Sequence, residues 1–150
     1  MPSKGHVQGT SLLQDLFERE PAGRFALGHI FRTAQAYPGL ADGFAADEVG
    51  YWRCDLADDD RLTWTDKVYE LFGFPAGSPI ERERAVARYK DHSRGVLERV
   101  RTFAIKRKCG FILDAAIEPA GLGNQWIRII AFPVIRDDQV VALHGQKRAL

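Results

Sequence analysis

Cysteine is scarce in this 150-residue chain, which carries only Cys54 and Cys109. Two cysteines are too few for the disulfide framework of a small secreted domain, so we expect reduced thiols in a cytoplasmic protein. Both lie in or beside predicted strands, where a free cysteine behaves as a small buried apolar side chain. The cysteines are therefore expected to have a packing role.

Long apolar runs and an excess of charge are missing as well. No window approaches the roughly 18 apolar residues of a membrane-spanning helix, and the N-terminal residues lack the apolar core of a signal peptide. The 21 Lys and Arg residues nearly balance the 20 Asp and Glu residues, for a net charge of +1. The basic residues 106–108 are interpreted as a solvated helix end. We therefore expect neither a membrane nor nucleic acid as a partner.

Motifs that carry catalysis are also absent. The sequence contains no Gly-x-Ser-x-Gly, no phosphate-binding glycine loop and no His-Glu-x-x-His. The acidic run Asp58, Asp59 and Asp60 lacks the rest of a calcium loop and is interpreted as a solvated turn. The chain is expected to have no catalytic residue, no metal site and no enzymatic activity of its own.

A compact unit over residues 50–75 organises the rest of the chain. Residues 51–56 alternate between apolar and polar side chains, which predicts a strand, and residues 61–64 predict a second strand after the aspartate turn. Thr65 is a suitable N-cap for the helix that follows. Gly73 ends that helix, because glycine readily takes the left-handed conformation at a helix C-terminus.

The remaining residues predict two helices and then three strands. A short helix is expected within residues 80–89, and a longer one over residues 92–107, with Asp91 as N-cap and one apolar face. Three strands with short, hairpin-like connections follow and should pair antiparallel with their neighbours. They cover residues 110–118, 125–135 and 140–147. Strands, helices and strands in this order predict an α+β domain with a five-stranded antiparallel sheet.

Residues 1–47 are predicted to be a helical extension and linker, and residues 48–150 the main domain. Apolar spacing predicts one helix over residues 11–20 and a second from Pro21 to about residue 36. Both faces of the third and fourth strands carry apolar residues, so the sheet face away from the long helix needs a cover. We expect the two N-terminal helices to cover it. Their surplus apolar surface predicts a homodimer.

Five short motifs follow one another along the main domain. The first three are Gly50-x-Trp52 with Asp55-Leu56, Leu62-x-Trp64-Thr65 and Glu70-Leu71-Phe72-Gly73. The fourth is YKDHSR at residues 89–94, and the fifth is the set of three C-terminal strands. In this order and spacing they resemble a PAS domain of the branch called PAS fold 3, in which the fourth motif is a His-Pro-Asp-Asp-Arg-like helix start. The resemblance covers roughly residues 48–148.

The resemblance implies a sheet of strand order 2-1-5-4-3, with helices on one face around a small-molecule cavity. It further implies a sensory or interaction module in cytoplasmic signal transduction, which passes a change on by docking in a homodimer or to an effector in trans. A ligand pocket is expected between the helix faces and the sheet. Its expected residues are Tyr69, Phe72, His92, Val96, Val100, Phe103, Leu113, Ile127 and Ile129.

The resemblance leaves the cofactor unknown. His92 could ligate a haem iron from the start of the long helix, but a histidine at this position is common in the branch without any haem. The Asn-Cys-Arg-Phe-like helical motif that forms a flavin adduct in light-sensing members is absent, and Cys54 lies on a strand instead. We therefore expect neither haem nor flavin.

Charged residues that interrupt apolar strands have two interpretations. Arg53, Asp114, Glu118 and Arg128 could form cross-strand ion pairs on an exposed edge of the sheet, or one or two of them could orient a polar ligand in the cavity. Two other functions stay open at this point. One is a small enzyme on a similar α+β fold, for which His92 with Asp91 is the nearest acid–base pair, and the other is a ligand-free dimerisation domain.

Overall fold

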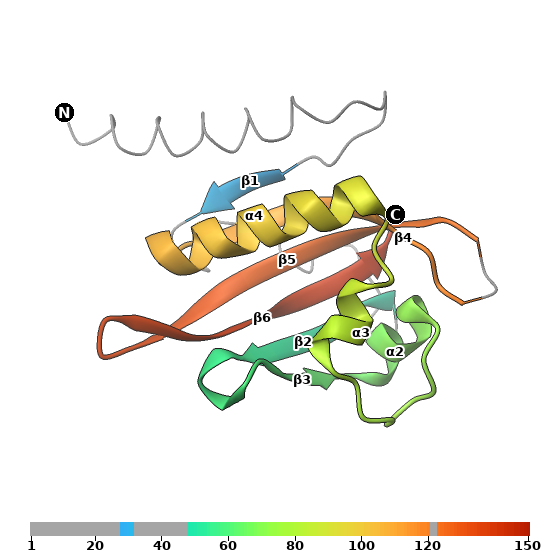
Figure 1. The fold of residues 1–150 in the computed structure, drawn as a ribbon, viewed down its shortest axis with the longest axis horizontal. Coiled ribbons are helices and arrows are strands. Elements are labelled where there is room, and N and C mark those ends of the chain that lie inside the picture. Colours follow the sequence, from blue (N-terminus) through green and yellow to red (C-terminus); the bar gives the residue numbers. More distant parts are fainter. Residues whose placement is uncertain (1–27, 32–47, 121–122) are drawn as a thin grey trace.

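A six-stranded antiparallel sheet forms the body of the protein in the computed structural model, which describes residues 28–31, 48–120 and 123–150 (Figure 1). Its strands are β1 (Gly28–Phe31), β2 (Gly50–Asp55), β3 (Arg61–Trp64), β4 (Gly110–Ile117), β5 (Gln125–Arg136) and β6 (Gln139–Ala149). The spatial order is β1-β4-β5-β6-β2-β3. The strands β2 to β6 thus have the predicted 2-1-5-4-3 order, and the predicted α+β class is confirmed.

Strand β1 corrects the prediction of one continuous helix from Pro21 to about residue 36. Gly28–Phe31 is extended and pairs antiparallel with β4, with Gly28 opposite Leu113 and Phe31 opposite Gly110. The outer strand of a sheet presents a row of unpaired backbone groups, and a further extended segment satisfies them. Glycine is also a poor helix former. The other residues of the predicted N-terminal helices lie outside the described part of the chain.

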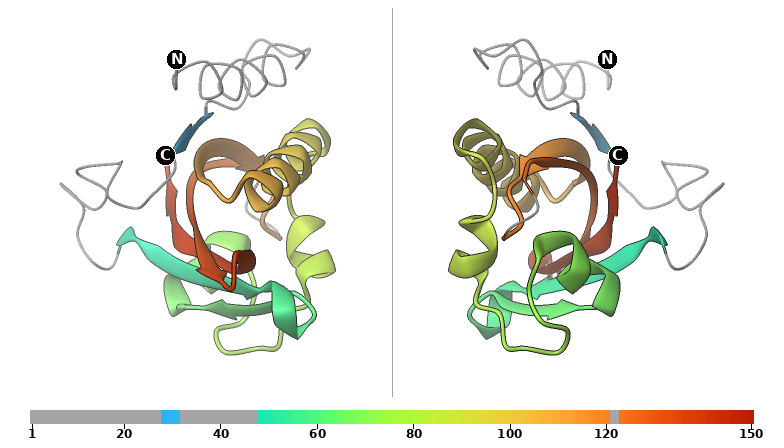
Figure 2. Two further views of the ribbon diagram at one scale, coloured as in Figure 1. Left: turned by 90° about the vertical axis from the view of Figure 1, so that its left-hand side faces the viewer. Right: turned by 90° about the vertical axis from the view of Figure 1, so that its right-hand side faces the viewer.

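Three helices lie between β3 and β4 in the sequence and on one side of the sheet (Figure 2). They are α2 (Asp66–Phe72), α3 (Arg82–Val86) and α4 (Asp91–Arg107), and a short 3-10 turn, η3 (Leu56–Asp58), precedes β3. Helix α4 packs along β4, and α2 packs against β2 and β3. The main apolar core lies between these helices and the sheet.

The ends of the helices follow the sequence closely. Gly73 takes a left-handed conformation with φ of 76° and ends α2, as predicted. Thr65 occupies the N-cap position, but its hydroxyl oxygen accepts a hydrogen bond from the Tyr51 N–H at 2.9 Å instead of capping the helix. Helix α4 begins at Asp91, one residue earlier than predicted, with Lys90 as N-cap. The Asp91 carboxylate pairs with Arg94 in the first turn.

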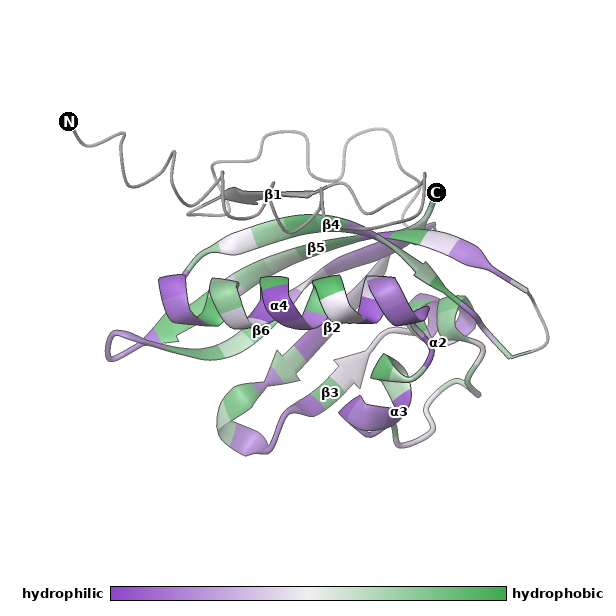
Figure 3. Ribbon diagram, turned by 45° about the horizontal axis from the view of Figure 1, so that its top comes forward, coloured by the Kyte–Doolittle hydropathy of each residue, from purple (hydrophilic) through white to green (hydrophobic). Residues whose placement is uncertain are grey.

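The two faces of the sheet differ in what they pack against. Side chains alternate along a strand, so Leu113 and Ile129 face the helices whereas Ile112 and Ile130 face the other way. Ile112, Ile130 and Phe132 form a second, smaller buried cluster on that other face. Every residue of β4 is buried, in line with the apolar residues of both parities in its sequence. Figure 3 shows hydrophobic residues along much of β4 and β5.

A bidentate ion pair joins the middle of β4 to β5. The Arg128 guanidinium donates to both oxygens of Asp114, at 2.7 and 2.9 Å, and the two residues are cross-strand partners. The cross-strand pairing of these two charges is confirmed, but the expected exposed edge is wrong, because Asp114 is buried and β4 lies between β1 and β5. Arg53 instead donates to Asp55 in its own strand, at 2.8 Å. Glu118 is exposed just beyond β4.

Candidate functional site

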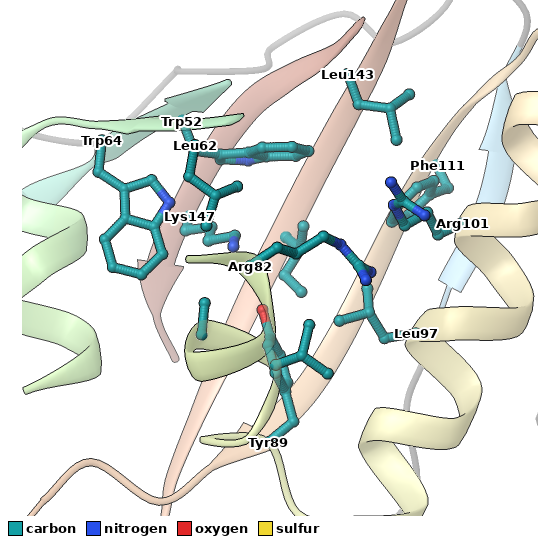
Figure 4. A pocket seen from close by; sticks show the side chains of 13 residues that line it. Trp52, Leu62, Trp64, Arg82, Tyr89, Leu97, Arg101, Phe111, Leu143 and Lys147 are labelled. Atoms are coloured by element: carbon teal, nitrogen blue, oxygen red, sulfur yellow. The ribbon is translucent and has the colours of Figure 1, made fainter. Parts of the chain in front are cut away.

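A cavity of about 60 Å³ lies between the sheet and the helices α3 and α4 (Figure 4). Its wall is mostly apolar and includes three cationic side chains. The strands contribute Trp52, Leu62, Trp64, Phe111, Ile129, Leu143 and Lys147, and the helical side contributes Arg82, Ala85, Val86, Tyr89, Leu97 and Arg101. Pockets that bind small molecules typically combine an apolar wall with a few placed polar groups, and this cavity has that composition.

The pairing of β2, β3 and β6 positions the strand side of the cavity. Trp52 lies opposite Trp64 on one side and opposite Gly145 on the other, so both indoles and the side chain of Lys147 face the helices. A side chain at Gly145 would bring its Cβ to 1.8 Å from the Ile130 carbonyl oxygen. The close approach of β5 and β6 beside the cavity therefore requires glycine.

Backbone contacts to β4 position the helical side. Tyr89 forms an isolated β-bridge with Ile117, and the Lys90 N–H donates to the Ala116 carbonyl at 3.0 Å. The Glu118 N–H donates to the Arg88 carbonyl at 2.8 Å. These bonds hold the segment between α3 and α4 against the end of β4. Tyr89 consequently points its ring into the cavity (Figure 4).

Lys147 places a buried amino group among aromatic rings. The side chain is 9% exposed, and Nζ lies 4.9 Å from the ring centre of Phe72, 5.0 Å from that of Trp52, 5.8 Å from that of Trp64 and 6.0 Å from that of Tyr89. Such rings attract a cation. Among the described residues, no carboxylate forms a salt bridge with this amino group.

Burial lowers the pKa of Lys147 to about 7. Loss of hydration is the largest cause, because the charged form loses more than the neutral form when water is excluded. The thiol of Cys54 opposes this shift when it is ionised, and the positive charge of Arg82 adds to it. The amine therefore changes its charge near neutral pH.

Two further polar groups at the cavity have no hydrogen-bond partner within the described part of the chain. They are the hydroxyl of Tyr89, a residue that is 3% exposed, and Nε1 of Trp64. Burial raises the pKa of Tyr89 far above its ordinary value, so this hydroxyl keeps its proton. Buried polar groups normally have partners, and leaving one unpaired costs about 1 to 3 kcal/mol.

The two arginines of the cavity wall differ from Lys147, because each has an acidic partner. Arg82 of α3 pairs with Glu98 of α4. Arg101 of α4 donates to Asp60, in the turn before β3, at 2.9 Å. These pairs connect the helices around the cavity and balance both guanidinium charges. Lys147 is thus the one cation of the cavity wall whose charge no described carboxylate balances.

Some of the predicted pocket residues lie at the cavity, and others lie elsewhere in the domain. Ile129 lines the cavity, and Phe72 lies against the Lys147 amino group. The hydroxyl of Tyr69 donates to the Ser78 carbonyl at 2.8 Å, and Nε2 of His92 is buried without a partner among the described residues. The others belong to the apolar core or pack against it: Val96, Val100, Phe103, Leu113 and Ile127.

Four residues of the cavity wall were not predicted from the sequence: Arg82, Tyr89, Arg101 and Lys147. A signal for Lys147 was present, since it has the same parity along β6 as Leu143 and should therefore share its face. The predicted strand over residues 140–147 already includes Lys147, and in the structure β6 continues to Ala149. Nothing in the sequence distinguishes Arg82 and Arg101 from the many other arginines, so their place at the cavity could not be predicted.

Neither haem nor flavin fits this cavity. A cavity of 150 Å³ holds about one benzene molecule, so 60 Å³ is too small for a flavin ring system or a haem. His92 is not part of the cavity wall, and the Cys54 thiol lies on β2, 3.9 Å from the Asp60 carboxylate. Both cysteines are buried, as predicted, and no disulfide joins them.

Within residues 28–31, 48–120 and 123–150, no group of three or more His, Cys, Asp or Glu side chains is placed to hold a metal ion. No helix in this part of the chain has the length and apolar character needed to cross a membrane.

Three solved structures are similar to this chain in fold. An RNA-binding light-oxygen-voltage receptor superposes with a TM-score of 0.61 and 15% identity, over 69% of this chain and 29% of the receptor. The N-terminal domain of a diguanylate cyclase with PAS/PAC sensor from Marinobacter aquaeolei superposes with a TM-score of 0.59 and 17% identity. The match covers 67% of this chain and 94% of that domain. A domain of a light and redox sensing histidine kinase from Haloarcula marismortui superposes with a TM-score of 0.59 and 12% identity. The match covers 75% of this chain and 95% of that domain.

The sequence itself gives no such match. No family model matches the chain, and no curated protein matches it. The likeness therefore lies in the fold, at identities of 12 to 17%. The chain covers less than a third of the light-oxygen-voltage receptor, so the activity of that whole protein is a separate question.

Proposed function

We propose that this domain, which has the PAS fold, is a sensory module of cytoplasmic signal transduction that binds a small molecule in the cavity lined by Lys147 and Tyr89. One observation carries the proposal. The Tyr89 hydroxyl is buried at a small cavity with no described hydrogen-bond partner, and the amino group of Lys147, a buried residue, lies among aromatic rings at the same cavity with no described carboxylate paired to it. A ligand with acceptor atoms would supply the missing partners and offset the cost of burying both groups.

The names of the similar structures support the sensory part of the proposal. They are described as a light-oxygen-voltage receptor, a PAS/PAC sensor of a diguanylate cyclase, and a light and redox sensing domain of a histidine kinase. In each name the similar domain is associated with detection of a signal. The cavity of this chain has a volume of about 60 Å³, which favours a small molecule as the signal.

Helix α3 is the element that we expect to respond to the ligand. It has five residues, contributes Arg82, Ala85 and Val86 to the cavity wall, and is tied to α4 by the pair between Arg82 and Glu98. A ligand can shift an equilibrium between two arrangements only by its difference in affinity for them. We propose that ligand binding favours one position of α3 and that a homodimer contact or an effector in trans detects the change.

Hydrogen exchange with a panel of small molecules tests this function. The full chain is incubated with neutral, anionic and cationic compounds of a few carbon atoms, and unfolding midpoints are recorded first. We expect at least one compound to raise the midpoint and to slow amide exchange in α3 and around Tyr89. Ala85→Leu is the matched control, because a larger side chain at this wall position takes up cavity volume and should abolish the effect.

The alternative, a ligand-free dimerisation domain, predicts a different outcome. If no compound of the panel changes the midpoint or the exchange of α3, and the Ala85→Leu protein is as stable as the parent or more stable, the cavity is only a packing defect. The proposed sensory function would then be wrong.

A further inference from the structure

We propose that the ligand of this site is a small monocarboxylate, whose carboxylate group binds Lys147 and Tyr89 and whose short alkyl part lies against the apolar wall. The inference rests on the proposed function, because it names the class of ligand for the same cavity. It follows from three independent properties of the cavity: its charge, its hydrogen-bonding groups and its size.

The charge of the cavity predicts a monoanion. The Arg82 guanidinium is balanced by Glu98, and that of Arg101 is balanced by Asp60. The amino group of Lys147 has no carboxylate partner in the described chain and is surrounded by ring faces. A cation in a site of low dielectric gains most from an anion in direct contact. One unbalanced positive charge matches one negative charge on the ligand.

The hydrogen-bonding groups of the cavity predict an acceptor. Ammonium and indole groups can only donate, and the Tyr89 hydroxyl keeps its proton because of its burial. Lys147 Nζ is 6.0 Å from the centre of the Tyr89 ring, and the hydroxyl points toward the part of the cavity that holds the amine (Figure 4). An ionised carboxylate has two oxygens and accepts at both, so one ligand group can bind both residues.

The size of the cavity limits the ligand to a few atoms. Its volume is about 60 Å³, less than half of the roughly 150 Å³ that holds one benzene molecule. The ligand must therefore have fewer non-hydrogen atoms than benzene, which leaves the smallest monocarboxylates, acetate and propionate. The apolar side chains of Leu97, Ile129 and Leu143 line the rest of the wall and suit an alkyl chain.

The protonation of Lys147 makes the expected binding depend on pH. The amine is charged below a pH of about 7 and neutral above it. Charged or titratable groups near it come from β2 (Cys54), from α3 and the segment after it (Arg82 and Tyr89) and from α4 (Arg101, paired with Asp60). Burial raises the pKa of Tyr89 and of Cys54, so Lys147 is the group among these whose pKa lies near neutral pH. We expect carboxylate affinity to fall about tenfold per pH unit above 7.

Calorimetric titration of the full chain with propionate tests the inference. Propionamide serves as the neutral compound of the same shape, and all buffers are free of carboxylates. We expect propionate to bind at pH 6.5 and propionamide to bind at least tenfold more weakly. Lys147→Met should weaken propionate binding at least about tenfold, and Tyr89→Phe about two- to tenfold. Lys106→Met, which changes an exposed lysine of α4, should bind as the parent does.

The possible outcomes distinguish an error in the proposed ligand class from an error in the proposed function. If propionamide binds as tightly as propionate, or if Lys147→Met binds propionate as the parent does, the carboxylate assignment is wrong while a sensory cavity remains. The same holds if another compound of the panel stabilises the chain and no monocarboxylate does. If no compound of any class binds, the sensory function is wrong, and the ligand class with it.

Discussion

Replacement of Lys147 by methionine should stabilise the protein and remove part of its dependence on pH. Burial lowers the pKa of Lys147 from 10.5 to about 7. At about 1.4 kcal/mol per pKa unit, the charged side chain destabilises the folded state by about 5 kcal/mol. Methionine has a similar length and no charge, and it can pack against Trp52 and Phe72 in the same space.

The sign and range of the pH effect follow from the two pKa values. The unfolded chain binds more protons at this lysine than the folded chain between pH 7 and about 10.5, so the parent gains stability as the pH rises through this range. The parent should therefore be less stable than Lys147→Met by about 4 kcal/mol at pH 7 and by about 2 kcal/mol at pH 9. Cys54 and Tyr89 are present in both proteins, so their own titrations largely cancel in the difference.

Urea unfolding of the parent and the variant at pH 7, 8 and 9 measures this difference. Lys106→Met controls for the loss of any lysine, and its difference from the parent should stay near zero at each pH. A Lys147→Met protein that is less stable than the parent, or a difference that does not change with pH, would refute the description of Lys147 as a buried cation without a partner.

Three other predictions concern the fold. Trp64→Ala should lower the free energy of unfolding by about 3 to 5 kcal/mol in urea, because the indole is 9% exposed and stacks on Phe72 at 5.1 Å; an unchanged urea midpoint would contradict its place in the core. Gly145→Ala should cost about 3 kcal/mol, since its Cβ would lie 1.8 Å from the Ile130 carbonyl oxygen; tolerance without loss of stability would disprove that close approach. Deletion of residues 1–38 removes β1 from the edge of β4, so it should lower solubility and change the mass measured by light scattering; the same mass, stability and solubility in the truncated chain would show that the segment is dispensable.

Much of the fold could be predicted because its signals are local. The limits of β3 agree with the prediction, and Gly73 ends α2 through a conformation that glycine favours. Strand β1 could not be predicted, because four extended residues have no period of their own and owe their structure to hydrogen bonds with Gly110–Ile117. In Gly28–Phe31, pairing with the edge of the sheet determines the structure more strongly than the helix propensity of the local sequence does.

The candidate site depended on longer-range information. Lys147 enters the cavity because β6 pairs with β2 in a register that sets Gly145 opposite Trp52. A shift of one residue would turn the amine to the other face of the sheet. The sequence could indicate apolar pocket walls, among which Ile129 was named, but the partners of Arg82 and Arg101 lie on other elements and required the structure.

The most direct test of the buried, unpartnered lysine is an NMR titration of its side chain in the full chain. The Cε and Hε resonances of the lysines are followed from pH 5.5 to 11, with Lys147 assigned by its loss in Lys147→Met. We predict that Lys147 titrates at about 7 in the free protein and at a higher pH with saturating propionate, because the carboxylate favours the charged amine. A Lys147 that titrates near its ordinary pKa of about 10.4, with no response to propionate, would contradict the account.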